Sequence, residues 1–280
     1  MMSTLIHAAP GAIRGVARWL VPVLALTIAG SPAVAQDLAD LTARAEPSVV
    51  ALKVFDSFGN PKGEGTGFFL SEGNGLLVTN HHVIEGGRRI VAELADGRSL
   101  EISQVLTEDK AEDLALIQVG EGPFPTGLPL AGSPARKGED IFVLGNPLGF
   151  ASTVSPGIIS GIHDQPDKMP DDWPHKRPVI QITAPISPGS SGSPVMNLRG
   201  EVLGVAVSMH TAGQNLNFAV PADAVKSLVL RARSGETRPA RQLGGGIAGQ
   251  LGGRGALIAR NLGISLLFFG GLFFAFRRLR

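Results

Sequence analysis

The sequence predicts an all-β fold of two packed six-stranded antiparallel barrels, or one large sandwich built from the same strands. Short apolar runs alternate with Gly, Pro, Asn and Asp turn signals from residue 48 to residue 220. No long helical pattern separates consecutive runs, which excludes parallel βαβ units. A stretch rich in glycine and proline, residues 120–138, divides the runs into two sets of six.

A short helix is expected at each end of this region. Residues 37–46 have apolar side chains at helical spacing, and Pro47 ends the pattern. Residues 223–231 form the second expected helix. In the first set of strands, Asp96-Gly97 favours a tight hairpin. The predicted strands are 48–55, 66–70, 76–79, 90–94, 100–106 and 113–119, then 140–144, 157–162, 179–183, 194–197, 201–207 and 216–220.

Two segments have unusual composition. Residues 161–178 contain four prolines and four acids and are expected to form a long surface loop. Residues 63–67 are rich in glycine, but no lysine follows and no helix opens there. This segment is therefore expected to be a bulged strand and not a phosphate-binding loop.

Composition excludes several classes of protein. The chain has 280 residues, of which 44% are hydrophobic and 18% charged, so it is not a disordered chain. It has no cysteine, which excludes disulfides, thiolate metal sites and a cysteine nucleophile. Residues 36–230 hold 14 basic and 23 acidic residues, a net charge of −9. An acidic middle argues against binding a nucleic-acid backbone.

The first 35 residues are expected to be an export signal. Arg14 and Arg18 precede an apolar run at 19–30, and 33–35 is a small-x-small cleavage site. A short membrane anchor is the alternative, but twelve apolar residues are too few to cross about 30 Å of hydrocarbon. The folded domain is then expected to be 36–232, outside the cytoplasm.

The C-terminus carries a second hydrophobic segment. Residues 233–255 are rich in glycine and arginine and are expected to be a flexible linker. Residues 256–280 are expected to span a membrane once, or to be a sorting tail that is removed, because an apolar stretch at 261–276 precedes three arginines. Basic residues next to a span tend to stay cytoplasmic, so the domain would face the periplasm from the inner membrane.

Three segments together suggest nucleophilic catalysis. Residues 189–194, Gly-Ser-Ser-Gly-Ser-Pro, can expose a serine oxygen where backbone N–H groups converge. A serine nucleophile needs a base, and 78–84 holds a histidine pair. Asp113 at the start of an apolar strand can orient that base, although alone it could be a solvated turn residue. The chain order is that of the chymotrypsin-like arrangement.

Metal chemistry is not expected. His81 and His82 are adjacent, so on a strand they would point to opposite faces. The sequence has no HExxH or similar spacing, which argues against a zinc hydrolase. No metal and no cofactor is therefore predicted.

The same segments resemble the HtrA (Deg) family of trypsin-like serine peptidases. Residues 78–84 resemble the family's T-N-x-H-V segment, whose catalytic histidine aligns with His82 and not His81. Residues 113–117 resemble its aspartate strand, and 188–194 resemble its G-[NS]-S-G-[GS] turn with the nucleophile at Ser191. Further similar segments are 145–149, 154–160, 197–204 and 217–221, so the resemblance spans 46–230.

The resemblance implies a trypsin-like fold and a role for each residue. Ser191 would attack the scissile carbonyl, His82 would move its proton, and Asp113 would orient His82. The backbone N–H groups of Gly189 and Ser191 would form the oxyanion hole. The pocket for the residue before the cut is implied at Pro185, Ser208, Met209 and His210, with small or medium apolar residues preferred.

The sequence also departs from the family's pattern. No PDZ-like pattern follows the helix at 223–231, and a hydrophobic segment stands there instead. Pro188 and Ser190 replace the Arg and Asn that many members carry beside the nucleophile, and Pro156 lies in the activation-type loop. The family's trimer is an expectation only.

These observations together predict a membrane-tethered, exported serine endopeptidase that cleaves exposed or unfolded polypeptide, in envelope quality control or signalling. The alternative is an inactive or latent protease-like module that binds peptides.

Overall fold

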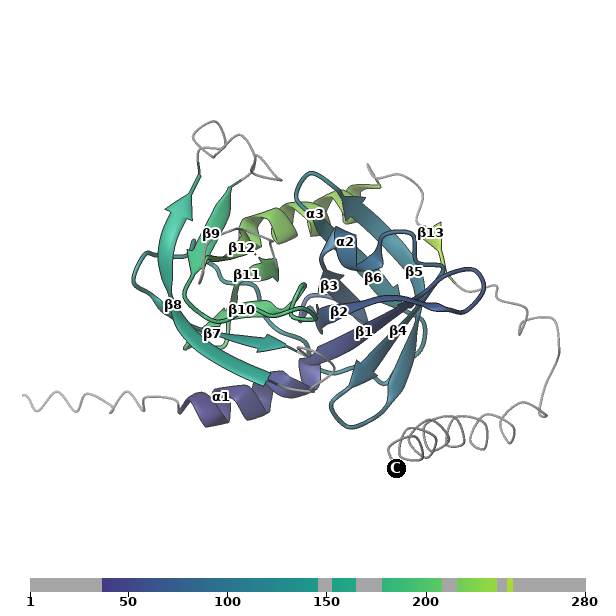
Figure 1. Cartoon of the computed structure of the whole chain (residues 1–280), viewed down its shortest axis with the longest axis horizontal. Helices are drawn as coiled ribbons and strands as arrows, with labels where there is room; N and C mark the ends of the chain where they lie inside the picture. The colour runs from purple at the N-terminus through teal and green to yellow at the C-terminus, as the bar shows by residue number, and fades with distance from the viewer. Residues whose placement is uncertain (1–36, 146–152, 165–177, 208–215, 236–240, 244–280) are drawn as a thin grey trace, which may run out of the picture. The chain divides into compact units, whose positions relative to one another are not determined.

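The computed structural model describes residues 37–145, 153–164, 178–207, 216–235 and 241–243 (Figure 1). The predicted export signal at 1–35 and the predicted membrane or sorting segment at 256–280 lie outside these residues. None of the helices in the described ranges has the length and apolar character needed to cross a membrane.

The first barrel is built from six strands that pair in the order β5-β4-β1-β2-β3-β6 and closes through β5 and β6. Apolar side chains of these strands, among them Leu52, Phe69 and Ile117, fill its interior and are fully buried. The strands are β1 Val49–Phe55, β2 Pro61–Phe69, β3 Leu76–Thr79, β4 Arg89–Leu94, β5 Ser99–Asp109 and β6 Leu114–Val119.

The second barrel closes in the order β10-β11-β12-β9-β8-β7, and every neighbouring pair is antiparallel. The prediction of two six-stranded barrels is confirmed, and the single sandwich is excluded because each set of strands closes on itself. The strands are β7 Asp140–Gly145, β8 Thr153–His163, β9 Val179–Ile182, β10 Pro194–Asn197, β11 Val202–Val207 and β12 Asn217–Pro221.

An apolar cluster joins the two barrels. Phe68 and Leu116 of the first barrel meet Phe142 and Met196 of the second in one fully buried group. Helix α1, Leu38–Ala45, adds Leu41 from one end, and helix α3, Ala222–Ser234, adds further apolar side chains from the other. Figure 1 shows α3 lying across the top of both barrels. Because this junction is dry and close-packed, residues that line it are held rigidly.

The N-terminal helix has a clear start and stop. The Asp37 carboxylate caps α1 by accepting a hydrogen bond from the Ala39 N–H at 3.2 Å. A 3-10 turn, η1 Glu46–Ser48, then carries Pro47 and leads into β1. Helix α3 runs to Ser234 and ends at Gly235, which has a φ of 73°. Both predicted helices are therefore confirmed, and the second is longer than expected.

Part of the predicted linker belongs to the folded domain. Residues Arg241–Gln242 form a strand, β13, that pairs with β5, and the following Leu243 is buried in the first barrel's core. The expected flexible tether from residue 233 is therefore wrong for these three residues, and also for Arg233 and Ser234, which end helix α3. A single apolar side chain among glycines gives no periodic pattern, so the sequence does not reveal this contact.

One further expectation is corrected, and another is confirmed except for the place of its irregularity. Strand β8 extends to His163, so the expected loop at 161–178 begins at the end of that strand, and residues 165–177 lie outside the described ranges. Residues 63–67 lie inside β2, as expected for a strand. The irregularity is close by, where Val54 pairs with Gly63 but Phe55 pairs with Pro61.

Candidate active site

His82 lies in a short helix and not at the end of a strand. Strand β3 ends at Thr79, Asn80 is extended, and His81–Ile84 form the four-residue helix α2. The expectation of two histidines on opposite faces of a strand is therefore wrong. The helix arises from tertiary contacts, because the His81 N–H and the Asn80 side-chain amide both donate to the Asp113 carbonyl, at 3.1 and 3.0 Å.

The imidazole of His82 is held by the carboxylate of Asp113. His82 Nδ1 lies 3.0 Å from Oδ1 and 2.8 Å from Oδ2, and the His82 backbone N–H donates to Oδ1 at 2.9 Å. The Asp113 side chain is 3% exposed, while that of His82 is 44% exposed. An ionised carboxylate only accepts hydrogen bonds, so Nδ1 carries the proton and Nε2 is left as the base.

Asp113 has an unusual backbone. Its φ is 50°, the left-handed region that few residues other than glycine adopt. This conformation ends the turn after β5. Strand β6 therefore begins at Leu114, one residue after the predicted start at Asp113. Helix α3 holds this turn, because the Arg231 guanidinium donates to Asp109 Oδ2 at 2.6 Å. Within the turn, the Glu112 N–H donates to Asp109 Oδ1 at 3.0 Å.

Ser191 directly follows a tight turn of residues 187–190 in the segment between β9 and β10, and residues 187–193 are called the serine turn. The Ser190 N–H donates to the Ser187 carbonyl at 2.9 Å, and Gly189 at the third position has a φ of 92°. These features, with Pro188 at the second position, define a type II turn. Compared with a type I turn, its central peptide is flipped, and this flip sets the direction of the Gly189 N–H. Pro188 therefore suits the turn, although it departs from the pattern of the resembling family.

The serine turn is anchored to strand β2 of the other barrel. The Thr66 N–H donates to the Ser191 carbonyl at 2.8 Å, and Thr66 Oγ1 donates to the Gly189 carbonyl at 2.8 Å. Thr79 Oγ1, at the end of β3, donates to the Thr66 carbonyl at 2.7 Å. Gly192 has a φ of 90°, and a Cβ there would collide with the Thr66 carbonyl. The turn thus packs against the residues that lead into α2.

Gly65 shows how close the serine turn lies to α2. A Cβ on Gly65 would lie 2.7 Å from the Val83 side chain, next to His82, and 3.2 Å from the Ser191 carbonyl. The structure therefore brings Ser191 to the neighbourhood of His82 and Asp113. The sequence did not single out Thr66 or Thr79; a threonine between two close-packed glycines, Gly65 and Gly67, is the signal that could have indicated Thr66.

The expected substrate pocket is described only in part. Pro185 is exposed in the segment that leads from β9 to the serine turn. Ser208, Met209 and His210 lie outside the described ranges. The pocket therefore stays a prediction.

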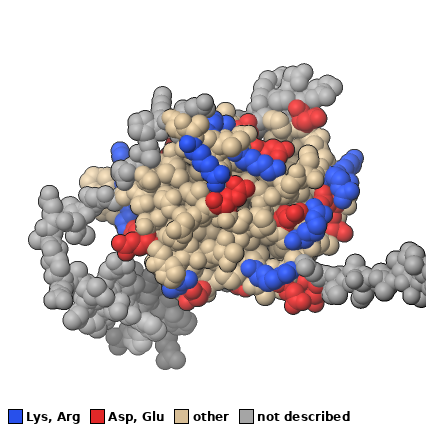
Figure 2. Space-filling model, turned by 180° about the vertical axis from the view of Figure 1, so that it is seen from behind, with Lys and Arg blue, Asp and Glu red and all other residues tan. Residues whose placement is uncertain are grey.

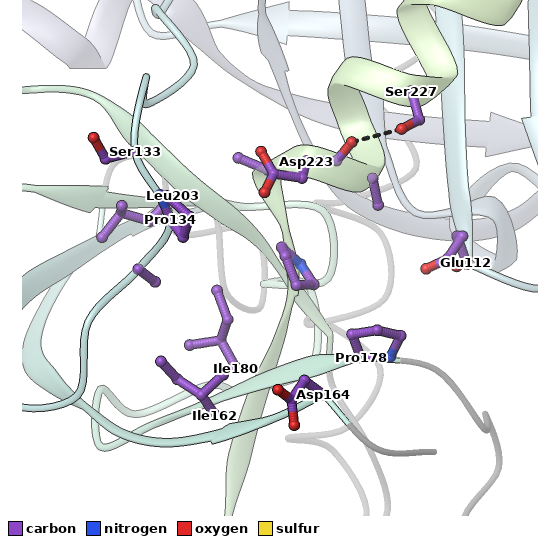
Figure 3. A pocket seen from close by; sticks show the side chains of 14 residues that line it. Glu112, Ser133, Pro134, Ile162, Asp164, Pro178, Ile180, Leu203, Asp223 and Ser227 are labelled. Carbon is purple, nitrogen blue, oxygen red and sulfur yellow. Dashed lines mark hydrogen bonds between the residues drawn. The ribbon is translucent and has the colours of Figure 1, made fainter. Parts of the chain in front are cut away.

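A cavity of about 490 Å³ lies elsewhere, between the start of α3 and the second barrel (Figure 3). Its floor is apolar, with Ile162, Ile180 and Leu203, and Asp164 and Asp223 lie at its edges. Glu112, next to Asp113, also borders it, but neither His82 nor Ser191 is among its lining residues. It is thus separate from the candidate catalytic residues.

Charge is mixed over the surface. Figure 2 shows basic and acidic side chains interspersed on the face seen from behind. Among the described residues, ion pairs of this kind include Lys53 with Glu93 at 2.7 Å and Arg199 with the partly exposed Glu201 at 2.8 Å. Within the described ranges, no group of three His, Asp or Glu residues is arranged to hold a metal ion.

Comparison with known proteins points to one family. The model of the trypsin-like peptidase domain matches residues 65–205. A serine protease named HhoA from Synechocystis sp. is 34% identical over 187 residues, covering 65% of this chain and 46% of that protein. A periplasmic serine endoprotease of DegP-like type from Halomonas elongata is 37% identical over 163 residues, covering 57% of this chain and 33% of that protein.

Solved structures agree with this comparison. The active form of the Rv3671c protease from M. tuberculosis is 32% identical with a TM-score of 0.60, covering 71% of this chain and 86% of that one. The chain spans less than half the length of the two curated relatives named above.

Proposed function

The chain belongs to the family of trypsin-like peptidases, and from this premise we propose that it is a serine endopeptidase acting through His82, Asp113 and Ser191. One observation carries the proposal. The His82 imidazole is held through Nδ1 by a buried carboxylate, and a glycine turn bearing a serine packs against the residues that lead into its helix.

The proposed chemistry follows the roles of these groups. Ser191 Oγ attacks the carbonyl carbon of the scissile peptide, and His82 Nε2 takes its proton. The Asp113 carboxylate stabilises the resulting imidazolium, and the N–H groups of Gly189 and Ser191 stabilise the oxyanion. His82 then gives the proton to the leaving amine, and water, activated in the same way, releases the acyl group from Ser191.

We further propose that the enzyme works outside the cytoplasm and is tethered to a membrane. The basic and apolar start of the chain, the apolar segment at 261–276 and its terminal arginines support this proposal. The Halomonas relative, whose name describes a periplasmic endoprotease, supports it too. Exposed or unfolded polypeptide is the proposed substrate, in quality control or signalling, with small or medium apolar residues before the cut.

The decisive experiment compares the full chain with Ser191→Ala in casein hydrolysis and in labelling by a fluorophosphonate. The wild type should cleave and become labelled, and Ser191→Ala should lose turnover by about 10⁴-fold or more. Ser133→Ala, an exposed serine away from the turn, is the matched control and should keep full activity. A wild type that is neither labelled nor active would instead support the peptide-binding module.

The tether is tested separately by fractionating cells that express the full chain and a chain lacking residues 256–280. The full chain should sediment with membranes and be accessible to protease from outside the cytoplasm, whereas the truncated chain should be soluble. Equal distribution of the two chains would contradict the tether while leaving the peptidase chemistry intact.

A further inference from the structure

A second histidine lies beside the candidate base. The side chain of His81 is only 11% exposed, and neither of its ring nitrogens makes a hydrogen bond. Two carboxylates flank the ring instead. Nδ1 lies 3.4 Å from Glu108 Oε2, and Nε2 lies 3.6 Å from Glu85 Oε1.

This arrangement favours a ring that carries both protons. A neutral imidazole has one N–H donor and one acceptor nitrogen. In the neutral form, one ring nitrogen of His81 would therefore direct its lone pair at a carboxylate oxygen that can only accept. With both nitrogens protonated, the ring turns an N–H and a positive charge toward each carboxylate, at the distances of ion pairs and not of hydrogen bonds. The two glutamates thus form a site for an imidazolium.

The charged neighbours of His81 come from several elements. Glu108 belongs to β5, and Glu85 follows α2. Lys110, in the turn after β5, lies 3.4 Å from the same Glu85 oxygen and lowers the pKa of that carboxyl, with a further contribution from His81. The other strands packed against α2 are β6, which has no charged residue, and β2, which carries Lys62 and Glu64.

The contacts of His81 with Glu85 and Glu108, called the His81 bridge, join the parts of the candidate site that must stay aligned. His81 immediately precedes His82, and its backbone N–H donates to the Asp113 carbonyl at 3.1 Å. Glu108 lies at the end of β5, just before the turn that carries Asp113. A contact between His81 and Glu108 therefore ties the helix that bears the base to the strand that leads to its carboxylate partner.

We propose that His81 is a positioning residue for His82: as an imidazolium it bridges Glu85 and Glu108 and fixes α2 against β5. The proposal rests on the proposed peptidase function, since it concerns the placement of the catalytic base. Loss of this bridge would leave α2 free to shift against β5, so the alignment of His82 depends on the contacts of a second histidine.

The first test measures the ring directly, by NMR of the full chain with ¹⁵N-labelled histidine and the Ser191→Ala change to prevent self-cleavage. The signals of His81 are those that vanish in His81→Gln. Both ring nitrogens of His81 should be protonated near neutral pH, and the hydrogen-bonded Nδ1 proton of His82 should shift or broaden in His81→Gln. A singly protonated His81 ring at this pH would overturn the proposal.

The second test measures activity. His81→Gln should lower kcat by about ten- to a hundredfold, with KM changed by less than about twofold. Glu108→Gln removes one carboxylate of the bridge and should lower kcat in the same way. Glu101→Gln on the same strand, an exposed glutamate paired with Arg89, is the matched control and should leave kcat and KM unchanged.

The outcomes separate this inference from the proposed function. If His81→Gln lowers kcat but Glu108→Gln does not, His81 only fills space and the positioning role is refuted. If the wild type has no peptidase activity at all, the proposed function fails, and the NMR measurement still decides whether the bridge exists and whether it holds His82.

Discussion

Replacement of Gly192 by alanine tests how the serine turn is held. The φ of Gly192 is 90°, and an alanine Cβ would collide with the Thr66 carbonyl and lie 2.5 Å from Thr79 Oγ1. The left-handed backbone should cost about 1–2 kcal/mol for alanine. Crowding against backbone that cannot rotate away should add about 1–3 kcal/mol. Gly192→Ala should therefore lower the free energy of unfolding by about 2–5 kcal/mol.

Gly97→Ala separates the two contributions. Gly97 has a φ of 84°, but nothing lies within 4 Å of a Cβ placed there. Gly97→Ala should therefore lower the free energy of unfolding by the backbone contribution alone, about 1–2 kcal/mol. Urea unfolding of both variants, in a Ser191→Ala chain that cannot cleave itself, measures the difference between them.

Gly192→Ala should lower kcat by about a hundredfold in the chain that keeps Ser191. The turn must move to relieve the collision, and a displacement of about 1 Å costs about a hundredfold in rate. Gly97→Ala should stay within about twofold of the wild type, because its hairpin is remote from Ser191. Equal losses of stability in the two variants, or a Gly192→Ala chain as active as the wild type, would refute the idea that Thr66 and Thr79 set the position of the serine turn.

Two further predictions concern stability. Thr79→Val removes the buried hydrogen bond to the Thr66 carbonyl and should lower the free energy of unfolding by about 1–3 kcal/mol in urea titrations. Thr42→Val removes a similar bond on the partly exposed helix α1 and should lower it by less. An equal loss in the two variants would contradict this prediction. The Asn197 side-chain amide, with help from Arg199, lowers the pKa of Glu201 from 4.5, so the folded state binds this proton more weakly than the unfolded state. The stabilisation from Glu201 should be complete above about pH 5 and fade as pH falls through its lowered pKa. The free energies of unfolding of the wild type and of Glu201→Gln should therefore converge in acid. A difference between them that does not depend on pH would contradict this prediction.

The sequence was sufficient for the barrels and for the identity of the candidate residues. Alternating apolar runs with turn signals predict strands because one face of each strand must be buried, and all twelve predicted strands exist. The chain order of His82, Asp113 and Ser191 could be recognised from the sequence without structural information. Pattern alone could not give the ends of β2 and β8, which extend where pairing with a neighbour continues beyond the apolar run.

Local conformation at the site could not be predicted, because long-range contacts determine it. The sequence around His81 continues an apolar strand, yet the chain turns into a helix there since its N–H groups find acceptors on Asp113. The left-handed backbone of Asp113 has no sequence signal, because aspartate adopts that region only when its surroundings require it. The hydrogen bond from Thr66 Oγ1 in β2 to the Gly189 carbonyl joins residues 123 positions apart.

The placement of the proposed catalytic groups depends on contacts between the barrels as well as on each barrel alone. His82 and Asp113 come from the first barrel, and Ser191 lies between two strands of the second. Thr66 links them on one side through the backbone of Gly189 and Ser191.

On the other side, α3 follows the last strand of the second barrel, and its Arg231 binds Asp109 in the turn that carries Asp113. The apolar cluster at the junction makes separation of the barrels costly, but burial has no direction and does not fix their orientation. The hydrogen bonds supply that direction. Variants of these cross-barrel groups should therefore reduce catalysis more than their effect on stability alone explains, whereas variants within one barrel that lie away from His81, His82, Asp113 and the serine turn should not.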